Sequence, residues 1–275
     1  MSYRAIMAYL APGAANENIV GIARDLASRT GSGVIGIAAA DVSPPTYFME
    51  GREAQLLLEQ MRAEVQVGLS ELRELFERQM RGADAAIEWR SDLRRPLDYL
   101  CEQSRAADVL IVPATRSVFS DPFATASLDS LLVAAGRPVI VIPSSVAFLD
   151  LRHVVVAWKD TREARRAVLD AIPLLKLAKE VSIVEVSEGR ADSTVAAGRL
   201  DDLRRWLERR GVSATWVALE SGGDTSARLK QFVSDAGAGM IVAGAFGHSR
   251  LQELVLGGVT DDLLRTSKVS LFLSN

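Results

Sequence analysis

The chain has 275 residues, of which 48% are hydrophobic and 24% charged, and its formal net charge at pH 7 is −3. This composition fits one large or two medium globular domains and lacks the basic excess typical of a nucleic-acid-binding protein. The single cysteine, Cys101, excludes an intramolecular disulfide, and no apolar run approaches the ~18 residues that span a bilayer. Because Met1–Arg4 leads straight into an apolar segment without a signal-peptide pattern, we expect a cytoplasmic protein with no membrane partner.

Short apolar segments alternate with amphipathic segments through the first half of the chain, which is the pattern of βα units. Leu57, Met61 and Val65 follow helical spacing within the longest amphipathic segment, so they predict one apolar face. The predicted strands are 3–10, 33–38, 85–89, 108–112 and 138–142, and the predicted helices are 16–30, 53–80, 96–105 and 128–135.

The second half repeats this order. Its predicted strands are 153–158, 181–186, 213–217, 240–243 and 269–273, and its predicted helices are 162–177, 195–210, 226–236 and 260–266. The strand at Val109 aligns with Met240 at an offset of about 131 residues, and Val139 aligns with Val269 at about 130. Nearly continuous β-branched strands are typical of parallel sheets covered by helices on both faces. We therefore predict an α/β protein of two tandem doubly wound (Rossmann-like) α/β sandwiches, each with a five-stranded, mostly parallel sheet, over residues 1–147 and 148–275.

The most specific pattern in the sequence is G-x2-G-x9-G, formed by Gly244, Gly247 and Gly257. It follows the predicted strand 240–243 and precedes the predicted helix 260–266. Glycines let backbone N–H groups approach an anion, and a helix N-terminus adds unpaired donors and the positive end of a dipole. The pattern predicts a phosphate-binding loop at the carboxyl end of a strand, where ligands of such sheets bind.

Together these features resemble the universal stress protein family in its tandem form. In the second half the resemblance rests on the βα order, on Ala157-Trp158-x-x-Thr161 after the first strand, and on the glycine pattern. In the first half it rests on the element order and on the run from Gly136 to Ile140. It implies an ATP or ADP site, with Mg²⁺ as an optional ion, and no dedicated hydrolytic machinery.

The resemblance also implies roles for individual residues. Residues 157–160 (Ala157, Trp158, Lys159 and Asp160) would border the adenine or ribose, and Val186 would offer backbone groups to the adenine. The remaining expected contacts are Val242 and Ala243 beside the nucleoside, Gly244 and Gly247 along the ribose and phosphates, and Gly257, Gly258, Val259 and Thr260 at the phosphates. A hydroxyl at Thr260 would also cap the following helix.

Three positions depart from the family pattern. Lys159 stands where many members have an acid, with Asp160 one position later, and Gly258 stands where many have serine. His248 follows the second glycine and faces either the phosphates or solvent. These departures weaken the expected adenine or ribose contact more than the phosphate contacts.

The corresponding loop of the first half, residues 114–135, contains no glycine and carries Asp121, Pro122 and Asp129 instead. Proline lacks an N–H donor, and carboxylates repel phosphates. We therefore predict one nucleotide per chain, bound by the second half.

The sequence lacks the lysine-bearing phosphate loop of common NTPases, the G-x-G-x-x-G of dinucleotide enzymes and the G-x-S-x-G elbow of hydrolases. Two histidines and one cysteine argue against a zinc site. A nucleotide-binding regulatory module of the stress response is thus the leading hypothesis. The alternatives are a slow ATPase or autophosphorylating protein, with Thr260 or Ser249 as the acceptor hydroxyl, and an interaction protein that binds an unknown protein partner without a nucleotide.

The resemblance further implies that the fifth strands, 139–142 and 269–273, pair between the repeats and form an intramolecular pseudo-dimer. Whether two chains also associate as a homodimer is left open by the sequence.

Overall fold

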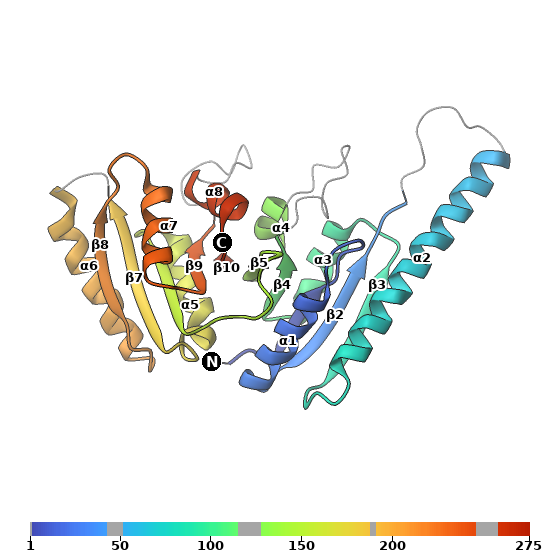
Figure 1. The fold of residues 1–275 in the computed structure, drawn as a ribbon, viewed down its shortest axis with the longest axis horizontal. Coiled ribbons are helices and arrows are strands. Elements are labelled where there is room, and N and C mark those ends of the chain that lie inside the picture. Colours follow the sequence, from blue (N-terminus) through green and yellow to red (C-terminus); the bar gives the residue numbers. More distant parts are fainter. Residues whose placement is uncertain (1, 43–51, 115–127, 188–190, 246–257) are drawn as a thin grey trace.

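The computed structural model describes residues 2–42, 52–114, 128–187, 191–245 and 258–275. Within these ranges a single ten-stranded sheet runs through the molecule in the order β3-β2-β1-β4-β5-β10-β9-β6-β7-β8 (Figure 1). Each half of the chain contributes five adjacent strands, so the two halves lie side by side along one sheet. The predicted fold class is confirmed.

The first half begins with β1 and ends with β5. Its strands are β1 (Ala5–Tyr9), β2 (Gly33–Ala39), β3 (Ile87–Asp92), β4 (Val109–Pro113) and β5 (Val139–Ile142). Its helices are α1 (Glu17–Thr30), α2 (Arg52–Met80), α3 (Pro96–Gln103), the 3₁₀ turn η1 (Ser104–Ala106) and α4 (Leu128–Ala134).

The second half repeats the topology. Its strands are β6 (His153–Trp158), β7 (Glu180–Ser187), β8 (Thr215–Glu220), β9 (Met240–Gly244) and β10 (Ser270–Ser274). Its helices are α5 (Arg162–Leu175), α6 (Ala191–Glu208), α7 (Thr225–Asp235) and α8 (Gly258–Thr266).

All strand pairs within each half are parallel, whereas β5 and β10 pair antiparallel across the junction. Phe272 faces Ile140 in this ladder, flanked by the Leu271–Val141 and Leu273–Val139 pairs. The expected pairing of the fifth strands, and with it an intramolecular pseudo-dimer, is confirmed.

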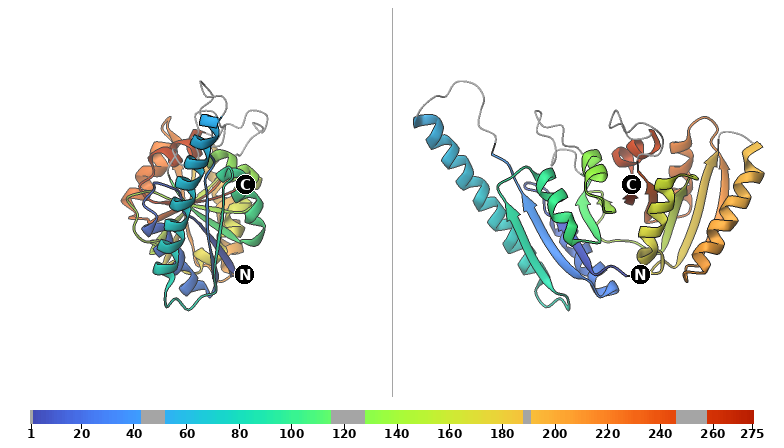
Figure 2. Two further views of the ribbon diagram at one scale, coloured as in Figure 1. Left: turned by 90° about the vertical axis from the view of Figure 1, so that its right-hand side faces the viewer. Right: turned by 180° about the vertical axis from the view of Figure 1, so that it is seen from behind.

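Helices cover both faces of the sheet, as the turned views show (Figure 2). One buried cluster joins α1, α2, α5 and α6 to the sheet, and a second joins α3, α4, α7 and α8 to the opposite face. Neighbouring residues of a strand enter different clusters: Val156 lies in the first and Val155 in the second. This double burial explains why the central strands read as continuous apolar runs. None of the helices in the described ranges is long and apolar enough to cross a lipid bilayer.

Several predicted boundaries were wrong, among them those of β8, which spans Thr215–Glu220 rather than 213–217. Strand β3 spans Ile87–Asp92 rather than 85–89, because an edge strand tolerates charged residues such as Glu88 and Arg90 that interrupt an apolar pattern. Helix α8 begins at Gly258, two residues before the predicted start.

The offset between the fifth strands is 132 residues rather than 130. The Ala114 amide donates to the Ile142 carbonyl at 2.8 Å, and the Ala245 amide donates to the Ser274 carbonyl at 2.8 Å. These bonds are equivalent in the two halves, so Ile142 corresponds to Ser274. The connection between the fourth and fifth strands is therefore one residue longer in the second half.

Candidate functional site

The sheet brings several of the predicted site residues together at one edge, the carboxyl ends of β6, β7 and β9. Ala157 of β6 is the register partner of Ala243 in β9, and Trp158 is the partner of Glu185 in β7. Val186 follows Glu185, so it lies beside the turn that begins at Lys159. The predicted residues placed at this edge are Ala157, Trp158, Lys159, Asp160, Val186, Val242, Ala243 and Gly244.

Gly244 ends β9 directly against the start of α5. A Cβ atom added at Gly244 would lie 2.5 Å from the backbone nitrogen of Ala164 and 2.6 Å from the carbonyl carbon of Glu163. The turn between β6 and α5 contains only residues 159–161, and the Thr161 side chain caps the helix by accepting from the Ala164 amide at 3.3 Å. The short turn thus brings a helix N-terminus, with its positive dipole end, to the carboxyl end of β9.

Helix α8 begins at the same end of the sheet (Figure 1). Gly258 is exposed and has open space around it, whereas Thr260 is buried. Because the helix starts at Gly258, Thr260 lies within its first turn, and the expected role of Thr260 as helix cap was wrong.

One acidic side chain of α8 attaches the helix to α7, and a second pairs within α8. Asp262 lies 2.6 Å from the Lys230 ammonium of α7 and accepts a hydrogen bond from the Ser226 hydroxyl. The Lys230 contact, followed by the Ser226 contact, lowers the pKa of the Asp262 carboxyl. Asp261 forms an ion pair with Arg265 on the next turn at 2.7 Å.

The remaining predicted phosphate contacts, Gly247, His248 and Gly257, lie outside the described residues. Their roles therefore stay predictions. Val259, by contrast, is described: it is half-buried in the first turn of α8 and packs against the core of that face.

Lys159 and Asp160 differ in their pairing. Asp160 is bound by the Arg165 guanidinium at 2.6 Å. Lys159 is exposed and forms no ion pair with any other residue in the described part of the chain. The edge therefore presents a lysine cation where the family pattern has an acid.

The sequence did not single out Glu185 and Arg199, which lie beneath this edge next to the predicted site residue Trp158. Glu185 of β7 is 7% exposed, and its Oε1 accepts a 2.6 Å hydrogen bond from Nη2 of Arg199 in α6. Trp158, beside Glu185 in the register, is 8% exposed. The only sequence signal was an acid between two valines in a buried strand, and its partner is fourteen residues away on a helix.

The first half fills the equivalent edge differently. By strand register Ile6 corresponds to Val154, so Tyr9 occupies the position of Ala157. Tyr9 is fully buried, and burial raises the pKa of its hydroxyl. Pro113 occupies the position of Gly244, which leaves the first half without that N–H group.

The loop after β1 closes on itself. The buried Asn16 amide accepts from the Ala11 amide at 2.9 Å and donates to the Ala11 carbonyl at 2.9 Å and the Ala14 carbonyl at 3.0 Å. These bonds stabilise the seven-residue connection (10–16) between β1 and α1. The equivalent connection between β6 and α5 is shorter, with three residues.

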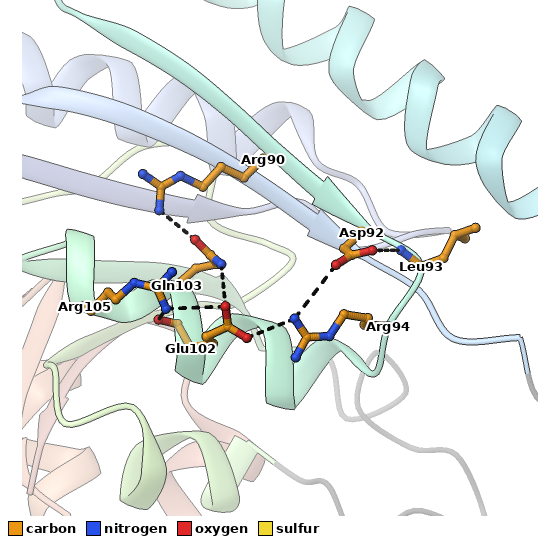
Figure 3. A network of polar contacts seen from close by, with 7 residues as sticks. All are labelled: Arg90, Asp92, Leu93, Arg94, Glu102, Gln103 and Arg105. Atoms are coloured by element: carbon orange, nitrogen blue, oxygen red, sulfur yellow. Dashed lines mark hydrogen bonds and ion pairs between the residues drawn. The ribbon is translucent and has the colours of Figure 1, made fainter.

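Charged groups at the end of β3 are also paired within the first half (Figure 3). Arg94 lies 2.9 Å from Glu102 and 3.8 Å from Asp92, and the Arg94 contact lowers the pKa of the Glu102 carboxyl. Arg90 donates to Gln103 at 2.8 Å. These arginines are therefore engaged by acids or amides of the first half.

His153 lies at the other end of β6, away from the site. Its Nδ1 is 3.1 Å from the Ala236 carbonyl and its Nε2 is 2.9 Å from the Ser182 hydroxyl. Among the residues that the structure describes, no three His, Cys, Asp or Glu side chains gather as metal ligands.

The chain resembles known proteins in sequence and in structure. Residues 150–274 match the model of the Universal stress protein family. No curated protein matches the chain. A universal stress protein from Archaeoglobus fulgidus DSM 4304 superposes with a TM-score of 0.72 at 16% identity, covering 98% of this chain and 96% of that one. A functionally unknown protein from Pseudomonas aeruginosa PAO1 gives a TM-score of 0.61 at 15% identity, covering 99% and 92%. At these identities the structures show a shared fold over both halves.

Proposed function

Because residues 150–274 belong to the universal stress protein family, we propose that this chain binds ATP or ADP in its second half and acts in the cytoplasm as a regulatory module of the stress response. One observation carries the proposal: the N-terminus of α5 packs directly on Gly244 at the carboxyl end of β9, beside the exposed cation of Lys159. A helix N-terminus at the switch in strand order is where such sheets bind phosphorylated ligands.

The proposal assigns one nucleotide to each chain, with the site in a domain over 148–275 and none in the domain over 1–147. Tyr9 supports this asymmetry, because its ring is buried where the second half has the small, half-exposed Ala157. Pro113 in place of Gly244 supports it as well.

Titration calorimetry with ATP–Mg²⁺, together with mass identification of any nucleotide released on denaturation, tests the proposal. We expect about one nucleotide per chain. Ala157→Tyr should weaken binding at least about tenfold while leaving the fold intact, because the first half accommodates tyrosine at the same position. Tyr9→Phe serves as the control and should leave binding unchanged. Two nucleotides per chain, or none, would contradict the proposal.

Autophosphorylation at Thr260 is disfavoured by its burial, since the side chain is only 9% exposed. Binding without rapid turnover instead favours the occupied conformation by mass action, which is what a regulatory module requires.

A further inference from the structure

Three buried polar atoms near the carboxyl ends of β6 and β7 lack a hydrogen-bond partner among the described residues. They are Nε1 of Trp158, Oε2 of Glu185 and Nε of Arg199. Native proteins rarely leave a buried donor or acceptor unpaired, because each one forfeits its hydrogen bonds to water. Three such atoms on adjoining residues point to a bound group that satisfies them.

The three residues are neighbours. Trp158 and Glu185 are register partners on adjacent parallel strands, so their side chains rise from the same face of the sheet. Arg199 descends from α6 onto that face and holds Glu185 through a single contact between Nη2 and Oε1. The contact leaves the other carboxylate oxygen and the guanidinium Nε–H open.

The first half provides an internal reference for this position. Leu10 and Ala38 occupy the places of Trp158 and Glu185 in the equivalent strands, and both are fully buried. The first half therefore fills these two positions with apolar side chains. Since an apolar pair suffices, the polar trio in the second half calls for a reason beyond folding.

The open atoms consist of two N–H donors and one carboxylate acceptor. One hydroxyl group complements this set, because its oxygen accepts two hydrogen bonds while its hydrogen donates one. We infer that Trp158, Glu185 and Arg199 form a binding site for a single hydroxyl group. Water and a ribose hydroxyl share this chemistry, and the second source rests on the proposed nucleotide function, since Lys159 and Val186 adjoin the site.

The indole N–H of Trp158 reports directly on the occupant. The four tryptophans of the chain give four indole signals in a ¹⁵N-labelled sample, and the Trp158 signal is the one lost in Trp158→Phe. In the free protein we expect a nuclear Overhauser effect between this N–H and water of long residence. The double variant Glu185→Ala/Arg199→Leu, which removes both charged partners at once, should abolish the effect while keeping Trp158 as the reporter.

Nucleotides distinguish the two sources. If the occupant is water, the signal persists when ATP is added, and 2′-deoxy-ATP and 3′-deoxy-ATP bind as ATP does. If the ribose supplies the hydroxyl, ATP removes the water signal. In that case one of the two deoxynucleotides binds the wild-type chain about tenfold more weakly than ATP does. The double variant then binds this deoxynucleotide and ATP with equal affinity.

The absence of a water signal in the free protein, combined with equal affinities for ATP and both deoxynucleotides, would overturn the site. Failure of the wild-type chain to bind any nucleotide would instead contradict the proposed function. In that case the presence or absence of the water signal would still show whether the three residues bind a hydroxyl group.

Discussion

Gly244 was singled out in the sequence as a ligand-contacting glycine, and the structure gives it a further role. Its backbone is not in the left-handed region, so conformational freedom does not explain the glycine. The absence of a side chain is instead required by the backbone of Glu163 and Ala164, which would contact any Cβ atom. Sequence spacing could not reveal this packing, because α5 and β9 are about eighty residues apart along the chain.

Replacing Gly244 by alanine should therefore destabilise the protein even without a ligand. We expect a loss of about 1–3 kcal/mol in the free energy of unfolding, the usual cost of overpacking. Gly258→Ala is the matched control, because open space surrounds Gly258 in the first turn of α8. This variant should be more stable than the wild-type chain by no more than about 0.5–1 kcal/mol in the free energy of unfolding. Urea unfolding of both variants measures the difference. Equal stability of the two variants would show that α5 does not pack closely enough on Gly244 to exclude a Cβ atom.

At the scale of elements, the two halves differ in the length of the connection between their first strand and first helix. Three residues join β6 to α5, whereas seven join β1 to α1. The short turn places a helix N-terminus at the sheet edge, and the long one needs the Asn16 amide to close it. Apolar periodicity predicted the strands and α-helices of the described residues, but it misplaced the bounds of several, among them β3 and the start of α8. Edge strands carry charges, and a glycine that begins a helix carries no apolar signal.

The attachment of α8 to α7 depends on Asp262, which binds both Lys230 and Ser226. Asp262→Ala should accelerate hydrogen exchange of the α8 amides and lower stability by about 0.5 kcal/mol, a small value because the ion pair is half-exposed. The pKa of Asp262 is lowered in the folded state. Its contribution is therefore fully present above the ordinary aspartate pKa of about 4 and is lost as the pH falls through the folded-state value.

Asp201→Ala provides the comparison for this prediction. Asp201 pairs with Arg204 and Arg205 inside α6, so its removal should leave exchange in α8 unchanged. Equal exchange rates for the α8 amides in Asp262→Ala and in the wild-type chain would refute the assigned role of Asp262.

At the scale of the whole molecule, the β5–β10 ladder and the contacts around it join the halves. Phe272 is fully buried at the centre of the ladder. Beside it, the Tyr3 hydroxyl donates to the Asp170 carbonyl of α5 at 2.8 Å, and the Ser274 hydroxyl donates to the Asp170 carboxylate at 2.7 Å. These contacts bind the start of the first half to the end of the second.

We therefore expect the chain to unfold as one unit. Trp89 reports on the first half, and Trp158, Trp206 and Trp216 report on the second. A variant that keeps only Trp89 and the variant Trp89→Phe should show the same denaturation midpoint by fluorescence. Phe272→Ala should lower stability by about 3–5 kcal/mol and move both signals together. Separate midpoints before that substitution would show that the halves fold independently.

The sequence revealed the tandem repeat and the parallel order, because these follow from local patterns and from the likeness of the two halves. The pairing of the junction strands was implied by the family resemblance. It did not reveal the Glu185–Arg199 pair or the burial of Tyr9 at the position of Ala157. Such contacts depend on which faces meet, and helix packing decides that only in the assembled fold. The nucleotide site at the end of β9 stays a prediction, and the contacts that surround it became visible only in the three-dimensional arrangement.

Joining both halves in one polypeptide has an evolutionary consequence. When two identical subunits meet along such a ladder, a single gene encodes both, so a substitution that spoils one pocket spoils the other as well. Two halves in one polypeptide are free of this constraint: Tyr9 and Pro113 stand in the first half where Ala157 and Gly244 stand in the second. The antiparallel junction at Phe272 and Ile140 preserves the geometry of a symmetric pair and leaves each copy free to diverge under its own selection.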